Sequence, residues 1–273
     1  MRWNRRMIAA SDVVWRMTEL LWQRTLRPLG GRSLDLLLPP GCAWCGGTGV
    51  LGEPLFCVDC LRKFTEELPE RRRCERCAAP IRAVGAVPLP CPYCSRRHYQ
   101  FARAWVLGDY RGPLRDAVVQ MKQAAREPLT IQMGRLVGQR LSQTGWATGC
   151  DLVAALPSHW WRRWSRGTSG PELLADEVAR ELNLPLVRGL LYCTRPTQKQ
   201  GTLSPHQRWL NVRGAFALRG KQDVSGRRVL LIDDVLTTGA TVNDAARALL
   251  AGGAGQVDVA VVARGLGDTG KSS

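Results

Sequence analysis

Two kinds of hydrophobic pattern alternate along the second half of the chain. Continuous runs of Val, Leu and Ile, which are typical of buried strands, are separated by segments with helical spacing or helix-terminal residues. The predicted strands span 102–110, 151–157, 227–234 and 256–264. The predicted helices span 114–124, 129–143, 171–183 and 241–253. This alternation predicts an α/β fold with a parallel sheet that is covered by helices on both faces.

The first 36 residues predict a basic amphipathic helix. Val13, Met17 and Leu20 recur at helical spacing, and Ser11 is a candidate N-cap. Such a helix can lie on a membrane surface, but we favour packing on the protein. No run of eighteen apolar residues predicts a membrane span, and the charged N-terminus does not resemble a cleavable signal peptide. We therefore expect a cytoplasmic protein.

Eight of the ten cysteines form four Cys-x2-Cys pairs in one window. The pairs are Cys42 and Cys45, Cys57 and Cys60, Cys74 and Cys77, and Cys91 and Cys94. Two thiolates three positions apart can hold one metal ion from a tight turn, so these pairs could supply two closed tetrahedral zinc sites. Four disulfides in a secreted domain are the alternative, and the expected cytoplasmic location favours zinc. A closed four-thiolate site predicts a structural or binding role rather than a catalytic one.

The sequence leaves the pairing of these four motifs open. Sequential pairing closes short, similar loops, whereas a cross-braced arrangement closes longer loops before any metal is held. We therefore prefer the sequential form. The expected organisation is a helical segment at 1–36, a double zinc ribbon at 37–100 and an α/β domain at 101–273.

The formal net charge of +16 is spread over both halves of the chain. A basic surface favours polyanions such as nucleic acid, anionic lipid or phosphorylated metabolites. Solubility alone is an equally good explanation of the excess. Two zinc ions with four thiolates each would lower the charge to about +12.

The stretch VLLIDDVLTTGATV at 229–242 carries the most specific chemistry. Asp233 and Asp234 lie at the carboxyl end of a predicted strand, where open α/β sheets bind ligands. The turn that follows leads into a helix N-terminus, which offers backbone N–H groups and a positive dipole end to a phosphate. The turn residues are Thr237, Thr238, Gly239, Ala240 and Thr241. A phosphorylated sugar fits both halves of this motif, and an ordinary βα turn with an Asx cap is the alternative.

This stretch closely resembles the phosphoribosyl pyrophosphate (PRPP) signature of type I phosphoribosyltransferases. The resemblance implies that Asp233 and Asp234 hold the ribose hydroxyls and that Thr237–Thr241 cradle the 5′-phosphate. Four Cys-x2-Cys pairs ahead of such a domain resemble the ComF family of competence-related proteins. That family's middle segment is similar to RPTQKQGTLSPHQRWLNVRGAF at 195–216, and Lys122 resembles its helix lysine. The resemblance covers nearly all of the chain after about residue 36.

Further site residues are expected around the predicted pyrophosphate. Pro157 and Ser158 match the place where pyrophosphate would bind. A loop punctuated by Gly and Pro carries cations that could close over it. These cations are Arg195, Lys199 and Arg208. The chain departs from the family at 166–170, where Arg and Gly remain but the usual aromatic and amide residues are absent.

The adjoining stretch HWWRRWSRG interleaves tryptophan with arginine. Tryptophan can stack on bases and arginine can pair with phosphate, which is one interpretation of this stretch. The other is an anchoring aromatic cluster with solvated arginines.

The sequence leaves two functions open. In the first, the chain is a cytoplasmic ComF-like protein that binds PRPP or another phosphorylated ribose and acts in DNA uptake. Its expected partners are single-stranded DNA and the competence machinery. In the second, the chain is a Mg²⁺-dependent phosphoribosyltransferase of nucleotide metabolism or salvage, since Mg²⁺ favours phosphate oxygens plus waters. Fold alone does not decide between them.

Overall fold

The computed structural model describes residues 41–48, 50, 55–65, 72–81, 83–84, 87–88, 90–95, 97–157, 170–198, 203–220 and 223–266. The predicted helix at 1–36, Ser158, Lys199 and the tryptophan-rich stretch lie outside the described residues.

A four-stranded parallel sheet forms the centre of the fold, as the sequence predicts. Its strands, in spatial order, are β3 (Arg103–Asp109), β8 (Gln256–Arg264), β7 (Arg228–Leu236) and β4 (Leu152–Ala155). The central strands are almost entirely buried, because both faces of the sheet are covered. Strand β7 extends two residues beyond the predicted end, and Asp233 is paired with Val261 of β8 inside the ladder.

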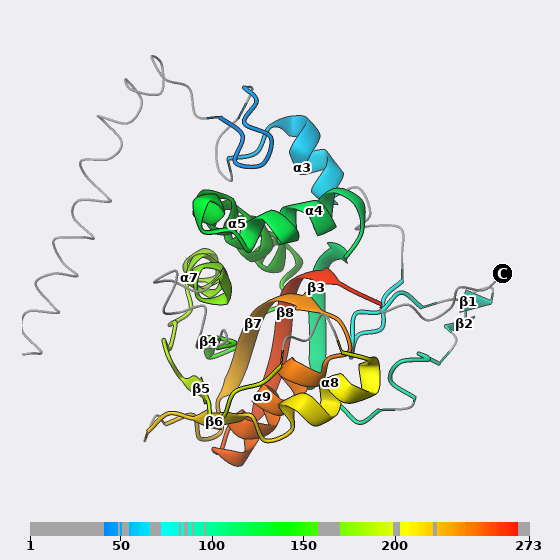
Figure 1. The fold of residues 1–273 in the computed structure, drawn as a ribbon, viewed down its shortest axis with the longest axis vertical. Coiled ribbons are helices and arrows are strands. Elements are labelled where there is room, and N and C mark those ends of the chain that lie inside the picture. The colour runs from blue at the N-terminus through cyan, green and yellow to red at the C-terminus, as the bar shows by residue number, and fades with distance from the viewer. Residues whose placement is uncertain are drawn as a thin grey trace, which may run out of the picture.

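Helices cover the two faces of this sheet (Figure 1). One face packs against α4 (Gly112–Met121), α5 (Glu127–Thr144) and α7 (Gly170–Leu182). The other packs against α9 (Ala240–Ala251). Successive residues of β7 serve opposite faces, so Leu230 contributes to the core under α5 and α7, whereas Leu231 contributes to the core over α9. A short 3₁₀ turn, η2 (Ala124–Arg126), joins α4 to α5.

A small antiparallel hairpin-like sheet lies beside α9. It consists of β5 (Leu191–Cys193) and β6 (Phe216–Leu218), with α8 (Pro205–Val212) in the connection between them. Helix α8 starts at a capping box in which Ser204 and Gln207 exchange hydrogen bonds. The buried carboxylate of Asp244 in α9 accepts hydrogen bonds from the backbone N–H groups of Gly214 and Phe216. This side chain therefore fastens the small sheet to the main domain.

The cysteine-rich part packs against the α/β domain on two sides. It contains α3 (Val58–Thr65) and the short strands β1 (Ala83–Val84) and β2 (Val87–Pro88). Cys42, Cys60 and Phe64 belong to the same core as α4 and α5. Cys77 and Ala79 instead belong to the core on the α9 face. Each half of the cysteine window thus adds to a different face of the sheet.

No helix among the described residues is both long enough and apolar enough to cross a membrane.

Candidate functional site

The β7–α9 turn presents a helix N-terminus whose N-cap residue is a glycine. Gly239 is the N-cap residue of α9, has φ 79°, and forms no side-chain cap hydrogen bond. The positive φ favours glycine at this position. A side chain here would also collide with Tyr99, because a Cβ on Gly239 would lie 2.8 Å from the Tyr99 Cε1 atom. The first N–H groups of a helix have no acceptor within it, so this turn can bind an anion.

Asp233 is a buried carboxylate whose surroundings disfavour its ionised form. It is 8% exposed, and one of its oxygens accepts the backbone N–H of Asp234 at 2.8 Å. Burial, followed by the neighbouring charge of Asp234, raises the pKa of Asp233 well above its ordinary value. A carboxylate held in this state would gain most from a ligand hydroxyl or a cation that stabilises its ionised form.

Asp234 is more exposed than Asp233 and pairs with a cation from another element. Its Oδ2 atom lies 3.3 Å from the Nζ atom of Lys122, the C-cap residue that follows α4. The lysine that the sequence comparison suggested therefore lies beside the acidic pair. Its charge lowers the pKa of Asp233, against the larger effects of burial and of Asp234.

The threonines of the turn are all partly buried, and the backbone carbonyls of the turn accept hydrogen bonds from two side chains outside it. The Thr238 Oγ1 atom accepts the N–H of Ala240 at 3.4 Å. The carbonyl oxygens of Leu236 and Thr237 accept hydrogen bonds from Arg264, and that of Thr238 accepts one from the Tyr99 hydroxyl at 3.4 Å. Both donors come from outside the motif, and the sequence analysis did not identify either of them. Neither residue belongs to a local motif that could have identified it.

Pro157 follows β4 at the same edge of the sheet as the acidic pair. The N–H of Leu156 donates to the Ile232 carbonyl at 2.9 Å, which fixes the end of β4 beside β7. The predicted cations Arg195 and Arg208 have other contacts. Arg195 is exposed and donates to the carbonyls of Asn211 and Arg213, whereas Arg208 donates to the Leu203 carbonyl. Both arginines thus bond to the backbone of their own segment, and among the described residues neither forms a hydrogen bond or ion pair with the turn.

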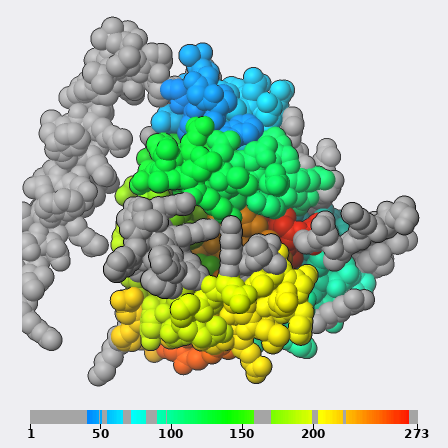
Figure 2. Space-filling model, viewed as in Figure 1, coloured from blue at the N-terminus to red at the C-terminus, as the bar shows by residue number. Residues whose placement is uncertain are grey.

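Part of the C-terminal portion of the chain is visible from outside. Figure 2 shows orange and red atoms of the C-terminal part of the chain between the green atoms of α4 and α5 and the yellow atoms of α8.

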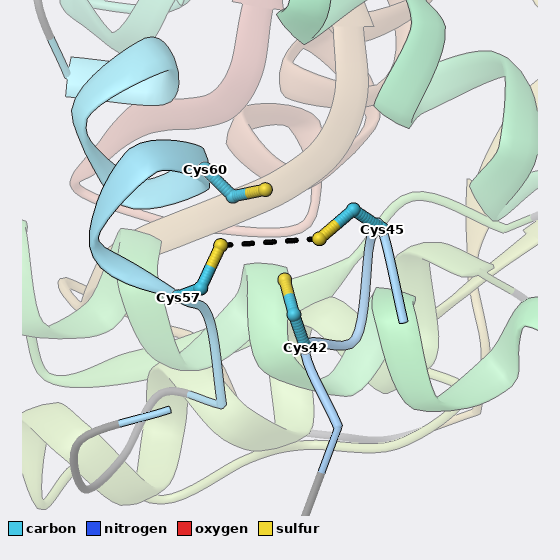
Figure 3. Close-up of side chains that lie close together, drawn as sticks. All are labelled: Cys42, Cys45, Cys57 and Cys60. Atoms are coloured by element: carbon cyan, nitrogen blue, oxygen red, sulfur yellow. Dashed lines mark hydrogen bonds between the residues drawn. The ribbon is translucent and has the colours of Figure 1, made fainter. Parts of the chain in front are cut away.

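The eight cysteines of the window form two clusters of four. Cys42, Cys45, Cys57 and Cys60 form the first cluster, and Cys74, Cys77, Cys91 and Cys94 the second. Figure 3 shows the first cluster, in which Cys57 and Cys60 come from the start of α3 and the other two from the preceding turn. The grouping is the sequential one preferred from the sequence. All four sulfur atoms of each cluster lie within 4.8 Å of one another.

The sulfur–sulfur distances fit a shared metal ion and exclude disulfides. Cys45 and Cys57 are 3.8 Å apart, and the pairs Cys74–Cys94 and Cys77–Cys91 are each 3.6 Å apart. Four thiolates at zinc distance in a tetrahedron are separated by about 3.8 Å. A disulfide would require about 2.05 Å. Burial raises the pKa of the Cys42 thiol, but hydrogen bonds from the backbones of Cys45, Cys57 and Trp44 outweigh it and lower this pKa to about 6.

A pocket of about 460 Å³ opens beside the first cluster. Its lining includes the Trp44 side chain, whose ring centroid lies 4.9 Å from that of Phe64, together with Lys63 and Arg126. Asp59 and Gln120 also line it. An aromatic ring with two exposed cations nearby is a suitable surface for a nucleic-acid strand.

Comparison with known proteins assigns the chain to a family. The phosphoribosyl transferase domain matches residues 168–273. The DNA utilization protein YhgH of Escherichia coli is 30% identical over 235 residues, which cover 85% of this chain and 100% of that protein. Competence protein F of Haemophilus influenzae is 25% identical over 82% of this chain and 96% of its own length. An orotate phosphoribosyltransferase of a Nocardioides species is 58% identical over 50 residues, or 18% of this chain and 27% of that enzyme. With its type I phosphoribosyltransferase fold and two four-cysteine clusters, the chain belongs to the ComF family.

Proposed function

We propose that this protein binds PRPP at the β7–α9 turn and acts in the handling of DNA. The binding of PRPP is supported by the N-terminus of α9, whose N-cap residue is a glycine, in the turn that follows the two acidic residues of β7. The 5′-phosphate would accept the N–H groups of the turn and the hydroxyls of Thr238 and Thr241. The ribose hydroxyls would donate to Asp234 and to Asp233, and burial now disfavours the charge of Asp233.

Magnesium would accompany the ligand rather than occupy a site of the protein alone. Asp234 is partly exposed and lies beside Lys122. It can therefore contribute one oxygen to a magnesium ion whose other ligands come from PRPP and water rather than from the protein. When bound with PRPP, Mg²⁺ would neutralise part of the pyrophosphate charge. The two cysteine clusters would each hold one structural zinc ion, because their sulfur distances fit a closed four-thiolate site.

The test of the sugar-phosphate site is titration calorimetry with PRPP and Mg²⁺. Wild type should bind, and the Asp233→Asn/Asp234→Asn double variant should lose most of the affinity. Arg103→Lys, at the amino end of the sheet, is the matched control for a general loss of stability, because Arg103 pairs with Asp258 instead. Equal binding by wild type and the double variant would refute this site.

The proposal for DNA rests on the names of the relatives and on the surface. Two relatives are named for DNA utilization and competence. The net charge of +16 and the Trp44 pocket supply cations and an aromatic ring. We expect single-stranded DNA to bind through phosphate contacts and stacking, with about 0.7 counterion released per neutralised phosphate.

A gel-shift series at several salt concentrations tests the DNA proposal. Lys63→Gln/Arg126→Gln should weaken binding and flatten its salt dependence, and Trp44→Ala should remove stacking of roughly 1–3 kcal/mol per base. Arg140→Gln/Arg188→Gln removes two charges elsewhere and serves as the control. Absence of binding by wild type at low salt would refute a direct role in DNA binding.

Transfer of phosphoribose is the second candidate function. It is favoured by the short match to an orotate phosphoribosyltransferase. Release of pyrophosphate from PRPP in the presence of candidate bases would support it. PRPP binding without pyrophosphate release would favour a binding role.

A further inference from the structure

The side chain of Arg264 connects the second cysteine cluster to the phosphate-binding turn. This arginine ends β8 and is only 2% exposed. Its Nε atom donates to the Cys77 carbonyl at 2.9 Å. Its Nη1 atom donates to the Leu236 carbonyl at 2.7 Å and to the carbonyls of Thr237 and Gly265. One buried guanidinium thus donates hydrogen bonds to the Cys74–Cys77 knuckle of the second cluster through Nε and to the turn through Nη1. A knuckle here means one Cys-x2-Cys pair with the turn that it encloses.

Arg264 contacts both knuckles of the second cluster. Cys77 closes the first knuckle, and the Tyr93 ring lies in the second, between Cys91 and Cys94, with its centroid 5.6 Å from the guanidinium carbon. Within the described part of the chain, this cation donates its hydrogen bonds to backbone carbonyls. A zinc ion with four thiolates would place a net charge of about −2 beside it. Metal binding would therefore stabilise Arg264 in its present position.

Tyr99 forms a second connection between the same two regions. It follows the last cysteine of the cluster by five residues, and its carbonyl accepts a hydrogen bond at 2.7 Å from Arg76, which lies inside the first knuckle. Its hydroxyl donates to the Thr238 carbonyl at 3.4 Å, and its ring fills the space over Gly239. The next residue, Gln100, donates its N–H to the Asn243 side chain in the first turn of α9.

These contacts determine the directions in which the carbonyl and N–H groups of the turn point. Arg264 and Tyr99 hold the carbonyl oxygens of Leu236, Thr237 and Thr238. In a trans peptide the carbonyl oxygen and the following N–H point in opposite directions. The N–H groups of Thr237, Thr238 and Gly239 are therefore turned away from the cluster, as an anion on the opposite side of the turn requires.

We propose that the second cysteine cluster, through the positioning residues Arg264 and Tyr99, sets the conformation of the phosphate-binding turn, so that metal at this cluster and phosphorylated ribose at the turn strengthen each other's binding. The reciprocal effect follows from thermodynamic linkage. The ligand half of this statement rests on the proposed function. The first cluster packs on the α4–α5 face instead and has no part in the coupling, which makes it an internal control.

Hydrogen exchange of the zinc-loaded full chain measures the coupling without any ligand. In Arg264→Lys, which keeps the charge but not the forked geometry, the amides of 237–242 should exchange at least about tenfold faster while both zinc ions are retained. The same amides should be affected in Cys74→Ser/Cys77→Ser but not in Cys42→Ser/Cys45→Ser. Arg103→Lys controls for loss of a partly buried arginine elsewhere. If the cysteine variant does not fold, Arg264→Lys and Tyr99→Phe decide the question.

Timed release of zinc to a chromogenic chelator measures the reciprocal effect. Saturating PRPP with Mg²⁺ should slow the release of one zinc ion at least about tenfold and leave the other unchanged, and Arg264→Lys should abolish this difference. Equal protection of both zinc ions, or unchanged exchange of the turn in both Arg264→Lys and Cys74→Ser/Cys77→Ser, would overturn the proposal. If PRPP binds neither wild type nor the variants but Arg264→Lys still speeds hydrogen exchange of the turn, the structural coupling of cluster and turn is supported. Only the identity of the proposed ligand is then refuted.

Discussion

The Lys122 ammonium lies 3.3 Å from the Asp234 carboxylate and joins the end of α4 to the acidic pair of β7. This positive charge also lowers the pKa of Asp233, although burial and Asp234 raise it by more. Replacing Lys122 with Met should therefore raise the pKa of Asp233 further. Because binding of ribose hydroxyls favours the ionised carboxylate, the low-pH limit of PRPP binding should move to higher pH.

Calorimetric titrations at several pH values measure this shift. Lys122→Arg retains the charge and should bind PRPP with nearly the wild-type pH dependence. The pair itself is partly exposed, so its loss should cost only about 0.2–1 kcal/mol of folding free energy. An unchanged pH profile in Lys122→Met would show that the Asp233 charge does not control binding.

Asp233→Asn should stabilise the ligand-free protein at neutral pH. Since the folded pKa of Asp233 is raised, the folded state holds its proton more tightly than the unfolded state. Wild type consequently loses stability as pH rises from the ordinary aspartate value of about 4 through the raised pKa. The asparagine avoids this loss, and its oxygen can still accept the Asp234 N–H.

Urea unfolding at two pH values tests the sign of this effect. We expect a gain of roughly 0.5–2 kcal/mol at pH 7, which disappears near pH 4 where Asp233 is protonated. A variant that is less stable than wild type at pH 7 would mean that the carboxylate has a stabilising partner.

Thr238→Val and Thr241→Val should each weaken PRPP binding by roughly 1–3 kcal/mol, because a phosphate oxygen loses a donor. Thr238→Val should also loosen the start of α9, since its hydroxyl accepts the Ala240 N–H. Thr144→Val, at the exposed end of α5, is the control for calorimetry. Unchanged affinity in both variants would place the phosphate elsewhere.

Asp244→Ala should detach the small sheet from α9. The substitution leaves the N–H groups of Gly214 and Phe216 without their acceptor, at roughly 1–3 kcal/mol for the buried Phe216 group and less for the exposed Gly214. Urea unfolding gives the loss, and increased hydrogen exchange at 214–216 gives its location. Arg247→Gln removes only the half-exposed partner of Asp244 and should cost less than about 1 kcal/mol.

The sequence predicted the long elements of the sheet because their patterns are local. The predicted strand at 256–264 coincides with β8, and the helix predicted at 171–183 coincides with α7 to within one residue at each end. The acidic pair and the glycine of the turn could also be identified, because their chemistry lies within one contiguous motif.

The short elements and the supports of the site could not be predicted. Strands β5 and β6 have only three residues each, and Cys193 finds its partner Phe216 across an intervening helix. Arg264 looks like an ordinary charged end of a strand until the fold brings the Cys77 carbonyl to it, from 187 positions away along the chain. For the predicted pyrophosphate cations Arg195 and Arg208, the pattern gives the residue types but not their present carbonyl partners, and their role toward pyrophosphate stays a prediction.

Strand β8 lies between β3 and β7, although it is the last of the four in chain order. During synthesis, β3 and β7 leave the ribosome before the strand that separates them, so neither can complete its ladder until β8 follows. Closing the β3–β8 pair spans about 150 residues, and such long-range pairing makes folding slow. Until then the chain exposes unpaired strand edges of nearly continuous apolar residues, which are prone to aggregate. Nascent chains arrested before β8 should therefore depend on chaperones far more than full-length ones.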